Sequence, residues 1–165
     1  MKRQKLIIPA IVVAVAVVVA AFGFRKESTA PEMLNVQIVN SKNQPVAFAD
    51  LKGKVVFVNN WASWCPPCIA EMPSIQKLKN KLADVDVAFV MVAFDEDREK
   101  AKKFMTKRNF DFEIYFPGQD YPFVTSSIPA TFILDKKGNI VSEHVGMADY
   151  SGDDIVSKLK ALANE

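Results

Sequence analysis

The stretch Val55-Val-Phe-Val-Asn-Asn-Trp61-Ala-Ser-Trp-Cys65-Pro-Pro-Cys68 decides how this chain of 165 residues folds. Residues 55–60 are a continuous run rich in β-branched side chains, which is typical of a strand buried on both faces. Residues 66–82 read as a helix, because Pro66 and Pro67 suit a first turn and the apolar side chains that follow recur at helical spacing. The chain's only two cysteines therefore lie at the junction of a buried strand and a helix.

The flanking sequence predicts the other elements of the domain. Short apolar pieces at 36–39 and 46–48 indicate an N-terminal β-hairpin. Further elements are expected as strands over 85–94, 112–116, 130–134 and 140–145, and as helices over 95–108 and 151–163. This order indicates an α/β fold with a mixed central sheet, and right-handed crossovers are expected to place helices on both of its faces.

The N-terminal residues differ from the rest of the chain. Residues 6–24 are 19 consecutive uncharged residues, long enough as a helix to span about 28 Å, roughly the hydrocarbon core of a bilayer. We therefore predict a single transmembrane anchor within residues 1–25, a linker over 26–33 and a globular domain over 34–165. A cleaved secretory signal is the alternative, since Val19-Ala20-Ala21 offers a small-residue cleavage site.

The charge distribution gives the expected orientation. Five of the 21 Lys and Arg residues and none of the 19 Asp and Glu residues lie in the first 26 positions. Lys2, Arg3 and Lys5 favour a cytoplasmic N-terminus, which predicts a domain on the extracytoplasmic side of a bacterial cytoplasmic membrane. The domain itself is mildly acidic with its bases interleaved, so no nucleic acid partner is expected.

The cysteine pair admits three interpretations. A zinc site needs two further ligands, and only His144 and carboxylates remain, so no metal is expected. A structural disulfide across so short a loop stabilises little. The third interpretation is a reversible dithiol/disulfide pair: Cys65 lies at the helix N-cap, where the dipole favours a nucleophilic thiolate, and Cys68 lies one turn further in, where it is more buried.

Three features in this order resemble the thioredoxin superfamily, and specifically the membrane-tethered TlpA/ResA-like thiol–disulfide oxidoreductases, which include cytochrome c maturation reductases. They are Trp-Cys-Pro-Pro-Cys after a β-branched strand, Glu71 three residues after Cys68, and the run Ile128-Pro129-Ala-Thr-Phe-Ile-Leu-Asp-Lys-Lys-Gly. The resemblance covers roughly residues 34–165. It implies a thioredoxin-like fold whose only redox group is the Cys65–Cys68 disulfide, with no cofactor.

The resemblance also implies roles for residues outside the cysteine pair. Pro129 is expected to be cis, leaving the Ile128 backbone free to pair with an extended substrate segment beside Cys65. Asn59 stands where ordinary thioredoxin carries an Asp, and an amide cannot accept the proton of the buried thiol. Glu71 is expected to take over that role with a raised pKa, the alternative being a solvated glutamate that only favours the helix dipole.

Other residues near the motif receive simpler interpretations. Trp64 is expected to shield the sulfurs and contact substrate together with Pro66 and Pro67, whereas Trp61 is assigned to the core. His144 is assigned to the surface of a strand. An aromatic group is interpreted as core rather than as a cofactor pocket: Phe110, Phe112, Tyr115, Phe116, Tyr121 and Phe123.

The function predicted from these observations is that of an exported, membrane-tethered thiol–disulfide reductase. The expected substrate is the Cys-x-x-Cys-His site of an apocytochrome c or another exported disulfide-bearing protein, and the expected electron donor is a transmembrane thiol carrier. A disulfide-forming oxidase has the same chemistry and differs in reduction potential. A thioredoxin-fold thiol peroxidase and a binding module with a structural bridge are the remaining alternatives.

Overall fold

The computed structural model describes residues 36–165, and the predicted anchor and linker lie outside these residues. The elements follow in the order β1 (Gln37–Asn40), β2 (Pro45–Ala47), η1 (Phe48–Leu51), β3 (Val55–Trp61), α3 (Pro66–Lys81), β4 (Val87–Ala93), α4 (Arg98–Arg108), β5 (Ile114–Pro117), β6 (Ala130–Leu134), β7 (Ile140–Val145) and α5 (Asp153–Asn164). Among these residues, no helix has the length and apolar character needed to cross a membrane.

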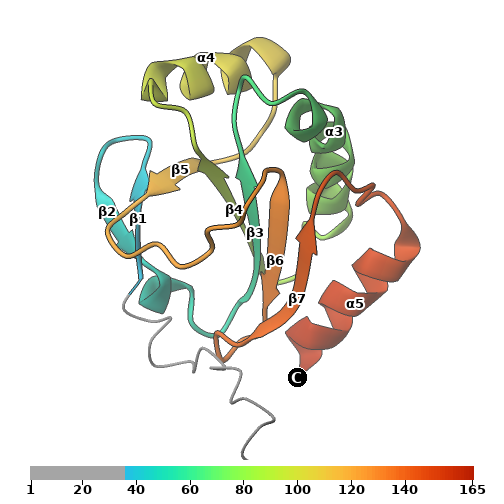
Figure 1. Cartoon of the computed structure of the whole chain (residues 1–165). Helices are drawn as coiled ribbons and strands as arrows, with labels where there is room; N and C mark the ends of the chain where they lie inside the picture. The colour runs from blue at the N-terminus through green and yellow to red at the C-terminus, as the bar shows by residue number, and fades with distance from the viewer. Residues whose placement is uncertain (1–35) are drawn as a thin grey trace, which may run out of the picture.

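The strands form one mixed sheet in the order β2-β1-β5-β4-β3-β6-β7 (Figure 1). Strands β3, β4 and β5 are parallel neighbours, and β1, β2, β6 and β7 add antiparallel ladders at the two sides. The fully buried β3 lies between β4 and β6 near the centre. The mixed sheet and the N-terminal hairpin of β1 and β2 confirm the fold expected from the sequence.

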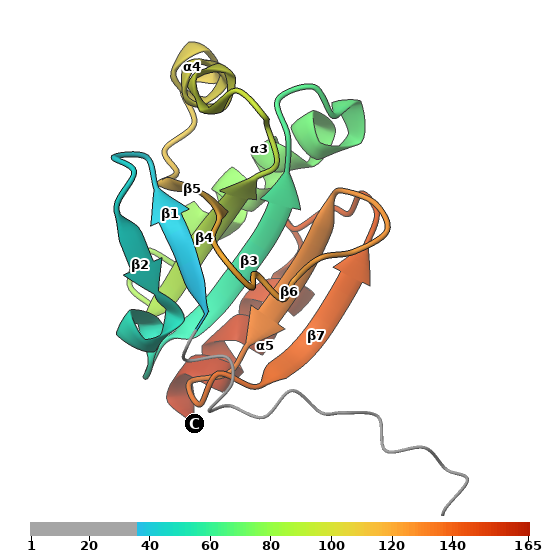
Figure 2. The same ribbon diagram turned by 60° about the vertical axis from the view of Figure 1, so that its left-hand side comes forward.

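The three α-helices all pack on one face of the sheet, which corrects the expectation of helices on both faces. Cys68 of α3, Met105 of α4 and Leu159 of α5 belong to one buried cluster with Phe57. Successive crossovers from β3 to β4 and from β4 to β5 advance in the same direction across the sheet, so right-handed connections place α3 and α4 on the same side. Figure 2 shows α3 and α5 behind the sheet.

The second face is covered by η1 and by the segment 118–129, which joins β5 to β6 and runs in front of the sheet in Figure 2. Its buried cluster contains no residue of an α-helix in the described part of the chain; Phe48 and Phe123 pack there with their ring centroids 5.4 Å apart. Asn60 of β3 ties the segment down: its Oδ1 accepts a hydrogen bond of 2.6 Å from the Tyr121 hydroxyl, and its Nδ2 donates to the Phe123 carbonyl.

Most element boundaries agree with the sequence-based prediction to within a few residues, and one difference matters for the site. The helix expected over 95–108 begins at Arg98, and the side chain of Asp97 caps it by accepting from the Glu99 N–H at 3.0 Å. Asp95 therefore lies outside the helix, just beyond the end of β4, where its carboxylate has a different partner.

The hydrogen bond between Asn60 and Tyr121 should contribute to the free energy of unfolding, because it holds segment 118–129 against the sheet. Replacing Tyr121→Phe leaves the buried Asn60 oxygen without its donor, so the free energy of unfolding should fall by about 1–2 kcal/mol, as measured by urea denaturation. Tyr115→Phe is the matched control, because the hydroxyl of half-buried Tyr115 bonds to the exposed Glu113 side chain and should change stability by less than about 0.5 kcal/mol. Equal stability of the two variants would contradict this account of the segment.

Candidate active site

Cys65 and Cys68 form a disulfide at the N-terminus of α3, immediately beyond the carboxyl end of β3. Their Cα atoms are 5.3 Å apart. Cys65 is the N-cap residue of α3, and its Sγ accepts a hydrogen bond of 3.3 Å from the Cys68 N–H. Both residues are buried, Cys65 with 3% and Cys68 with 0% of its surface exposed. Cys68 is therefore the more enclosed of the two, as expected.

Pro66 and Pro67 occupy the first positions of α3 and are exposed beside the disulfide. A helix N-terminus normally offers several free N–H groups to a capping side chain. Because proline has no N–H, these two positions offer none, and the Cys68 N–H is the donor that reaches the Cys65 sulfur. The prolines thus leave the helix dipole in place while reducing the direct stabilisation of a thiolate.

The Ile128–Pro129 peptide bond is cis, as the family resemblance implies, and it lies next to Cys65. The Ile128 carbonyl oxygen is 3.8 Å from the Cys65 sulfur. Within residues 36–165 the Ile128 N–H has no hydrogen-bond partner, whereas the following Pro129 carbonyl accepts from the Gly146 N–H at 2.9 Å. An unpaired backbone segment beside the sulfur can form a short ladder with an extended peptide.

Glu71 is buried and held by donors from two other elements. Its Oε1 accepts a hydrogen bond of 2.8 Å from Asn59 Nδ2 on β3, and its Oε2 accepts one of 3.1 Å from the Ala148 N–H after β7. Asn59 Nδ2 also donates to Thr131 Oγ1 on β6 at 3.0 Å, and Asn59 Oδ1 has no partner among the described residues. Glu71 is therefore part of a buried polar cluster with Asn59, Thr131 and Ala148, and it is not a solvated glutamate of the first turn.

Burial is the main influence on the Glu71 pKa. Desolvation raises the pKa of the carboxyl from its ordinary value of 4.5 to about 7, although the hydrogen bonds from Asn59 and Ala148 act in the opposite direction. Glu71 also lines a groove of about 310 Å³ together with Lys77 and Met147. The carboxyl thus has a pKa near neutral pH and belongs to a residue that lines a surface groove.

Two contacts that support the site were not predicted from the sequence. The Asp95 carboxylate accepts from the Ser63 N–H at 3.0 Å and from the Ser63 hydroxyl, which holds the turn before Cys65. Ser74 Oγ donates to the Glu71 carbonyl at 2.7 Å and accepts from the Tyr150 N–H at 3.0 Å. An acidic residue at the end of a buried strand is a weak signal for the first contact. The second contact joins the Ser74 side chain to backbone groups of Glu71 and Tyr150, and the residue type does not reveal such backbone partners.

Three exposed apolar side chains belong to the segments around the disulfide, and we call them the apolar rim. They are Trp64, Val124 and Met147, with 64%, 67% and 58% of their surface exposed. Trp64 precedes Cys65, Val124 lies in the segment that ends at Pro129, and Met147 precedes the Ala148 N–H that binds Glu71. Trp61 is fully buried and His144 is exposed, as the sequence suggests.

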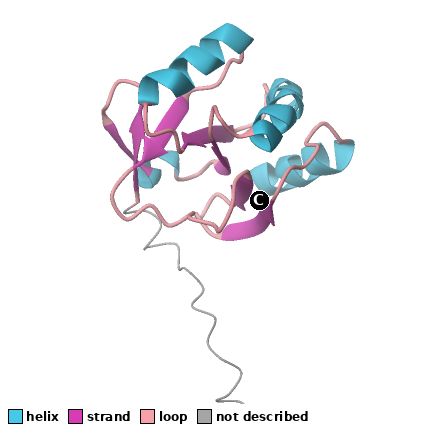
Figure 3. Ribbon diagram, turned by 45° about the horizontal axis from the view of Figure 1, so that its top comes forward, coloured by secondary structure: helices cyan, strands magenta, loops and turns pink. Residues whose placement is uncertain are grey.

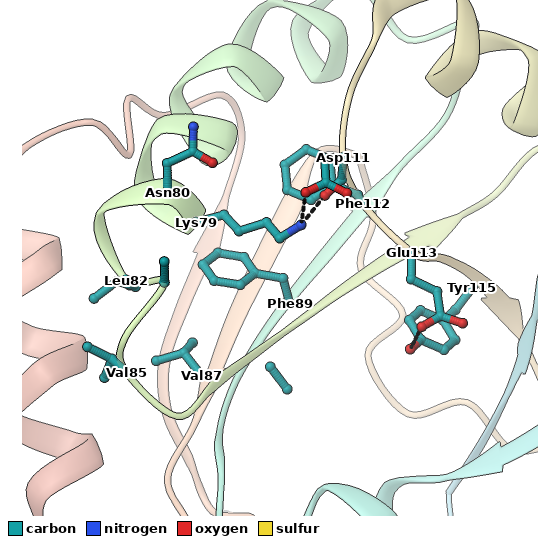
Figure 4. Close-up of a pocket in the computed structure, with 12 residues that line it drawn as sticks. Lys79, Asn80, Leu82, Val85, Val87, Phe89, Asp111, Phe112, Glu113 and Tyr115 are labelled. Carbon is teal, nitrogen blue, oxygen red and sulfur yellow. Dashed lines mark hydrogen bonds and ion pairs between the residues drawn. The ribbon is translucent and has the colours of Figure 1, made fainter.

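A second groove, of about 500 Å³, lies at the other end of α3 (Figure 4). The ion pair between Lys79 Nζ and the Asp111 carboxylate, 2.8 Å long, crosses it beside Phe112. Neither cysteine lines this groove. Of the aromatic group, Phe116, Tyr121 and Phe123 are buried core, while Phe112 and Tyr115 are half-buried and line the groove. In the described residues no group of three or more His, Cys, Asp or Glu side chains is placed to hold a metal ion.

Comparison with known proteins gives concordant matches. The Redoxin family model matches residues 25–160. The chain is 35% identical over 130 residues to thioredoxin-like protein YneN of Bacillus subtilis (75% of this chain, 74% of the relative), and 30% identical over 118 residues to thiol-disulfide oxidoreductase ResA of Bacillus thuringiensis (70% and 68%). A thiol:disulfide interchange protein of Chlorobium tepidum superposes with a TM-score of 0.64 and 26% identity, over 75% of this chain and 91% of that structure.

The raised pKa of Glu71 predicts how stability depends on pH. Between about pH 4.5 and 7 the folded state holds a proton on Glu71 that the unfolded state has lost, so this group's contribution to the free energy of unfolding falls as pH rises through 7. Glutamine does not titrate. The stability of Glu71→Gln relative to the parent protein should therefore improve between pH 5 and pH 8 in urea unfolding of the oxidised protein.

The control for this measurement is Glu143→Gln, which removes a carboxyl that is exposed on β7. Its stability difference from the parent should stay constant over the same pH range. A difference between Glu71→Gln and the parent that does not change with pH would show that Glu71 is not a titrating group with a raised pKa.

Proposed function

The chain belongs to the Redoxin family and is a thiol–disulfide oxidoreductase of the TlpA/ResA-like group of the thioredoxin superfamily, and on this premise we propose that it reduces disulfides of exported proteins from a membrane-tethered position. Cys65 is the nucleophile in this proposal, Cys68 the resolving cysteine and Glu71 the proton acceptor. Ile128 and Pro129 orient the substrate backbone, and Trp64, Pro66 and Pro67 contribute to the surface that contacts it.

One arrangement carries the proposal. Cys65, which caps α3, lies beside the backbone of Ile128, whose N–H is unpaired in the described residues. The same helix carries the buried Glu71, whose carboxyl pKa is raised to about 7. The Ile128 carbonyl is 3.8 Å from the Cys65 sulfur. Glu71 follows Cys68 by three residues, which places both side chains on the same face of α3. A substrate strand, a nucleophile and a proton acceptor can therefore act together at one helix terminus.

The first step is attack on the substrate disulfide. In the reduced protein the Cys65 thiolate, favoured by the α3 dipole, attacks one sulfur of a substrate disulfide paired in extended form with Ile128. A Cys65–substrate disulfide forms, the substrate S–S bond breaks, and the released substrate sulfur leaves as a thiolate that takes a proton from solvent. The apolar rim contacts the side chains that flank the substrate cysteines.

The second step resolves the mixed disulfide and uses Glu71. The ionised carboxyl accepts the proton of the buried Cys68 thiol, and the resulting thiolate attacks the Cys65 sulfur. The Cys65–Cys68 bond forms and the second substrate thiolate is released, so two electrons have passed to the substrate. The proton held by Glu71 returns to solvent through the groove beside Lys77 and Met147.

The proposed setting comes from the N-terminal sequence. The 19 uncharged residues over 6–24 and the preceding Lys2, Arg3 and Lys5 support a membrane anchor with the domain on the extracytoplasmic side of a bacterial cytoplasmic membrane. A thiol reductase in that compartment needs a source of two electrons, and we assign this role to a transmembrane thiol carrier. The proposed substrate class is the oxidised Cys-x-x-Cys-His segment of apocytochrome c, as in cytochrome c maturation.

A trapping experiment tests the proposed roles of the cysteines. Cys68→Ala should accumulate a disulfide between Cys65 and an oxidised Cys-Ala-Ala-Cys-His peptide, because no second thiol can resolve it. The adduct is measured by non-reducing mass spectrometry of the reduced, full-length variant mixed with the peptide. Cys65→Ala is the control and should form no adduct, since it lacks the proposed nucleophile and Cys68 is the more enclosed of the two cysteines.

Trapping on Cys68 in place of Cys65 would reverse the assignment of the two sulfurs. Equilibration of the unmodified protein with glutathione then fixes the direction of electron flow. A reduction potential near or below about −250 mV is expected for a reductase, and one near −120 mV would make the protein an oxidant.

The proposed role of Glu71 predicts a change in the rate of the second step. Glu71→Gln removes the proton acceptor and should slow decay of the Cys65–peptide disulfide by about 10²-fold at pH 7, whereas Glu143→Gln should leave the rate unchanged. In the parent protein the rate should rise with pH through about 7 as Glu71 ionises. Acid-quenched samples separated by chromatography give the rate, and identical pH profiles for Glu71→Gln and the parent would exclude this role.

A further inference from the structure

Helix α4 carries a concentration of positive charge next to the active site. Six of its eleven residues are Lys or Arg and one, Glu99, is acidic. Outside α4, the residues of the described domain contain more Asp and Glu than Lys and Arg. The domain is therefore electrically asymmetric: α4 carries a net positive charge, whereas the rest of the described domain carries a net negative charge.

Three of these cations form a stripe on one side of the helix. Lys100, Lys103 and Lys107 are exposed, and their spacing of three and four residues places them on one face. Within residues 36–165 none of the three has an ion-pair partner, whereas Lys102 pairs with Glu99 at 2.8 Å. We call Lys100, Lys103 and Lys107 the lysine stripe.

The other two cations of α4 face the protein rather than an external partner. The Arg98 guanidinium donates to Asn43 Oδ1 at 2.7 Å and lies 4.7 Å from the centre of the Phe116 ring. The Arg108 guanidinium lies 5.7 Å from the centre of the Phe104 ring. These contacts account for the structural use of Arg98 and Arg108, but they leave the lysine stripe unexplained.

The stripe borders the end of the domain that carries the disulfide. Phe104 follows Lys100 by four residues and precedes Lys107 by three, so the two lysines flank it on the helix. The Phe104 ring packs against Trp61, the last residue of β3, with the centroids 5.6 Å apart. Figures 1 and 3 show α4 at the same end of the sheet as the N-terminus of α3.

We propose that the lysine stripe is a docking surface for an acidic segment of the protein that exchanges electrons with Cys65. This inference rests on the proposed function and names the chemistry of its partner. A protein is favoured over an anionic membrane surface because the Phe104–Trp61 contact joins α4 to the strand that leads directly to Cys65, the residue that is proposed to exchange electrons with protein partners.

Elementary electrostatics gives the expected behaviour of such a surface. Charges of one sign near a reactive centre raise the association rate of oppositely charged partners by 10-fold or more, and salt suppresses the effect because the screening length falls to about 3 Å at 1 M. Solvent-exposed lysines contribute to the rate of association more than to final affinity. The rate of disulfide reduction, measured as a function of substrate charge and salt, is therefore the informative quantity.

The experiment compares two oxidised peptides with the full-length protein in a neutral detergent. Both contain Cys-Ala-Ala-Cys-His, flanked in one by four glutamates and in the other by four lysines. At low salt the reduced protein should reduce the acidic peptide about 10-fold faster than the basic one, and the difference should disappear near 1 M salt. The triple variant Lys100→Gln, Lys103→Gln, Lys107→Gln should lose most of this preference.

A matched triple variant separates the stripe from net charge. Lys137→Gln, Lys158→Gln, Lys160→Gln removes the same charge from exposed lysines of the β6–β7 turn and α5, and it should keep the preference for the acidic peptide. Reduction of the uncharged hydroxyethyl disulfide should be equal in all three proteins. Equal rates for the two peptides in the parent, or an equal loss of preference in both triple variants, would overturn the docking proposal.

Two further outcomes would also overturn it, and they differ from one another. If the parent protein reduces neither peptide nor hydroxyethyl disulfide, the reductase function itself fails, and the docking proposal fails with it. If phosphatidylglycerol in phosphatidylcholine vesicles protects the lysine stripe from amine acylation while Lys137 and Lys158 stay reactive, the stripe binds lipid. Mass spectrometry of the reconstituted full-length chain gives the acylation pattern.

Discussion

The burial of the Glu71 carboxyl is the constraint on which the rest of the site depends. A carboxyl taken out of water needs hydrogen-bond donors from the protein, or its pKa rises until it is neutral. Here Asn59 on β3 and the Ala148 N–H after β7 supply donors, and Asn59 in turn reaches Thr131 on β6. The hydrogen bonds around the Glu71 carboxyl therefore join α3 to β3, to β6 through Asn59, and to the segment between β7 and α5. The pKa of about 7 shows that these donors compensate only part of the desolvation.

The segment between β5 and β6 links the core to the substrate surface. Asn60, next to Asn59 on β3, points to the opposite face and holds this segment through Tyr121 and the Phe123 carbonyl. The same segment ends in Ile128 and Pro129 beside the Cys65 sulfur. Two adjacent asparagines of β3 thus support different parts of the site. Asn59 donates to the Glu71 carboxyl, and Asn60 holds the segment whose end is proposed to pair with substrate. This follows from the alternation of side chains along a strand.

Local sequence patterns were sufficient to predict the elements that form the site and the chain's membership of the TlpA/ResA-like group of the thioredoxin superfamily. The β-branched run of β3 and the helical spacing in α3 are properties of short segments, and they place Cys65 at a helix N-cap without reference to the rest of the fold. The arrangement of helices was not predictable in the same way. It depends on β5 lying beside β4 in parallel, and neither the composition nor the periodicity of residues 114–117 specifies a neighbour. The sequence-based expectation of helices on both faces was wrong for that reason.

The sequence by itself determined the chemistry of this protein: two cysteines at a strand–helix junction, two prolines between them, a glutamate one turn further on, and a proline immediately before the buried strand β6. These features are residue types and their spacing, and both can be read directly from the sequence. The tertiary structure decided the environment of those groups. The pKa of Glu71, the support of Ser63 by Asp95 and the packing of Phe104 on α4 against Trp61 all depend on burial and on contacts between residues far apart in the chain. Backbone donors such as the Ala148 N–H leave no mark on the sequence, because every residue except proline carries the same group.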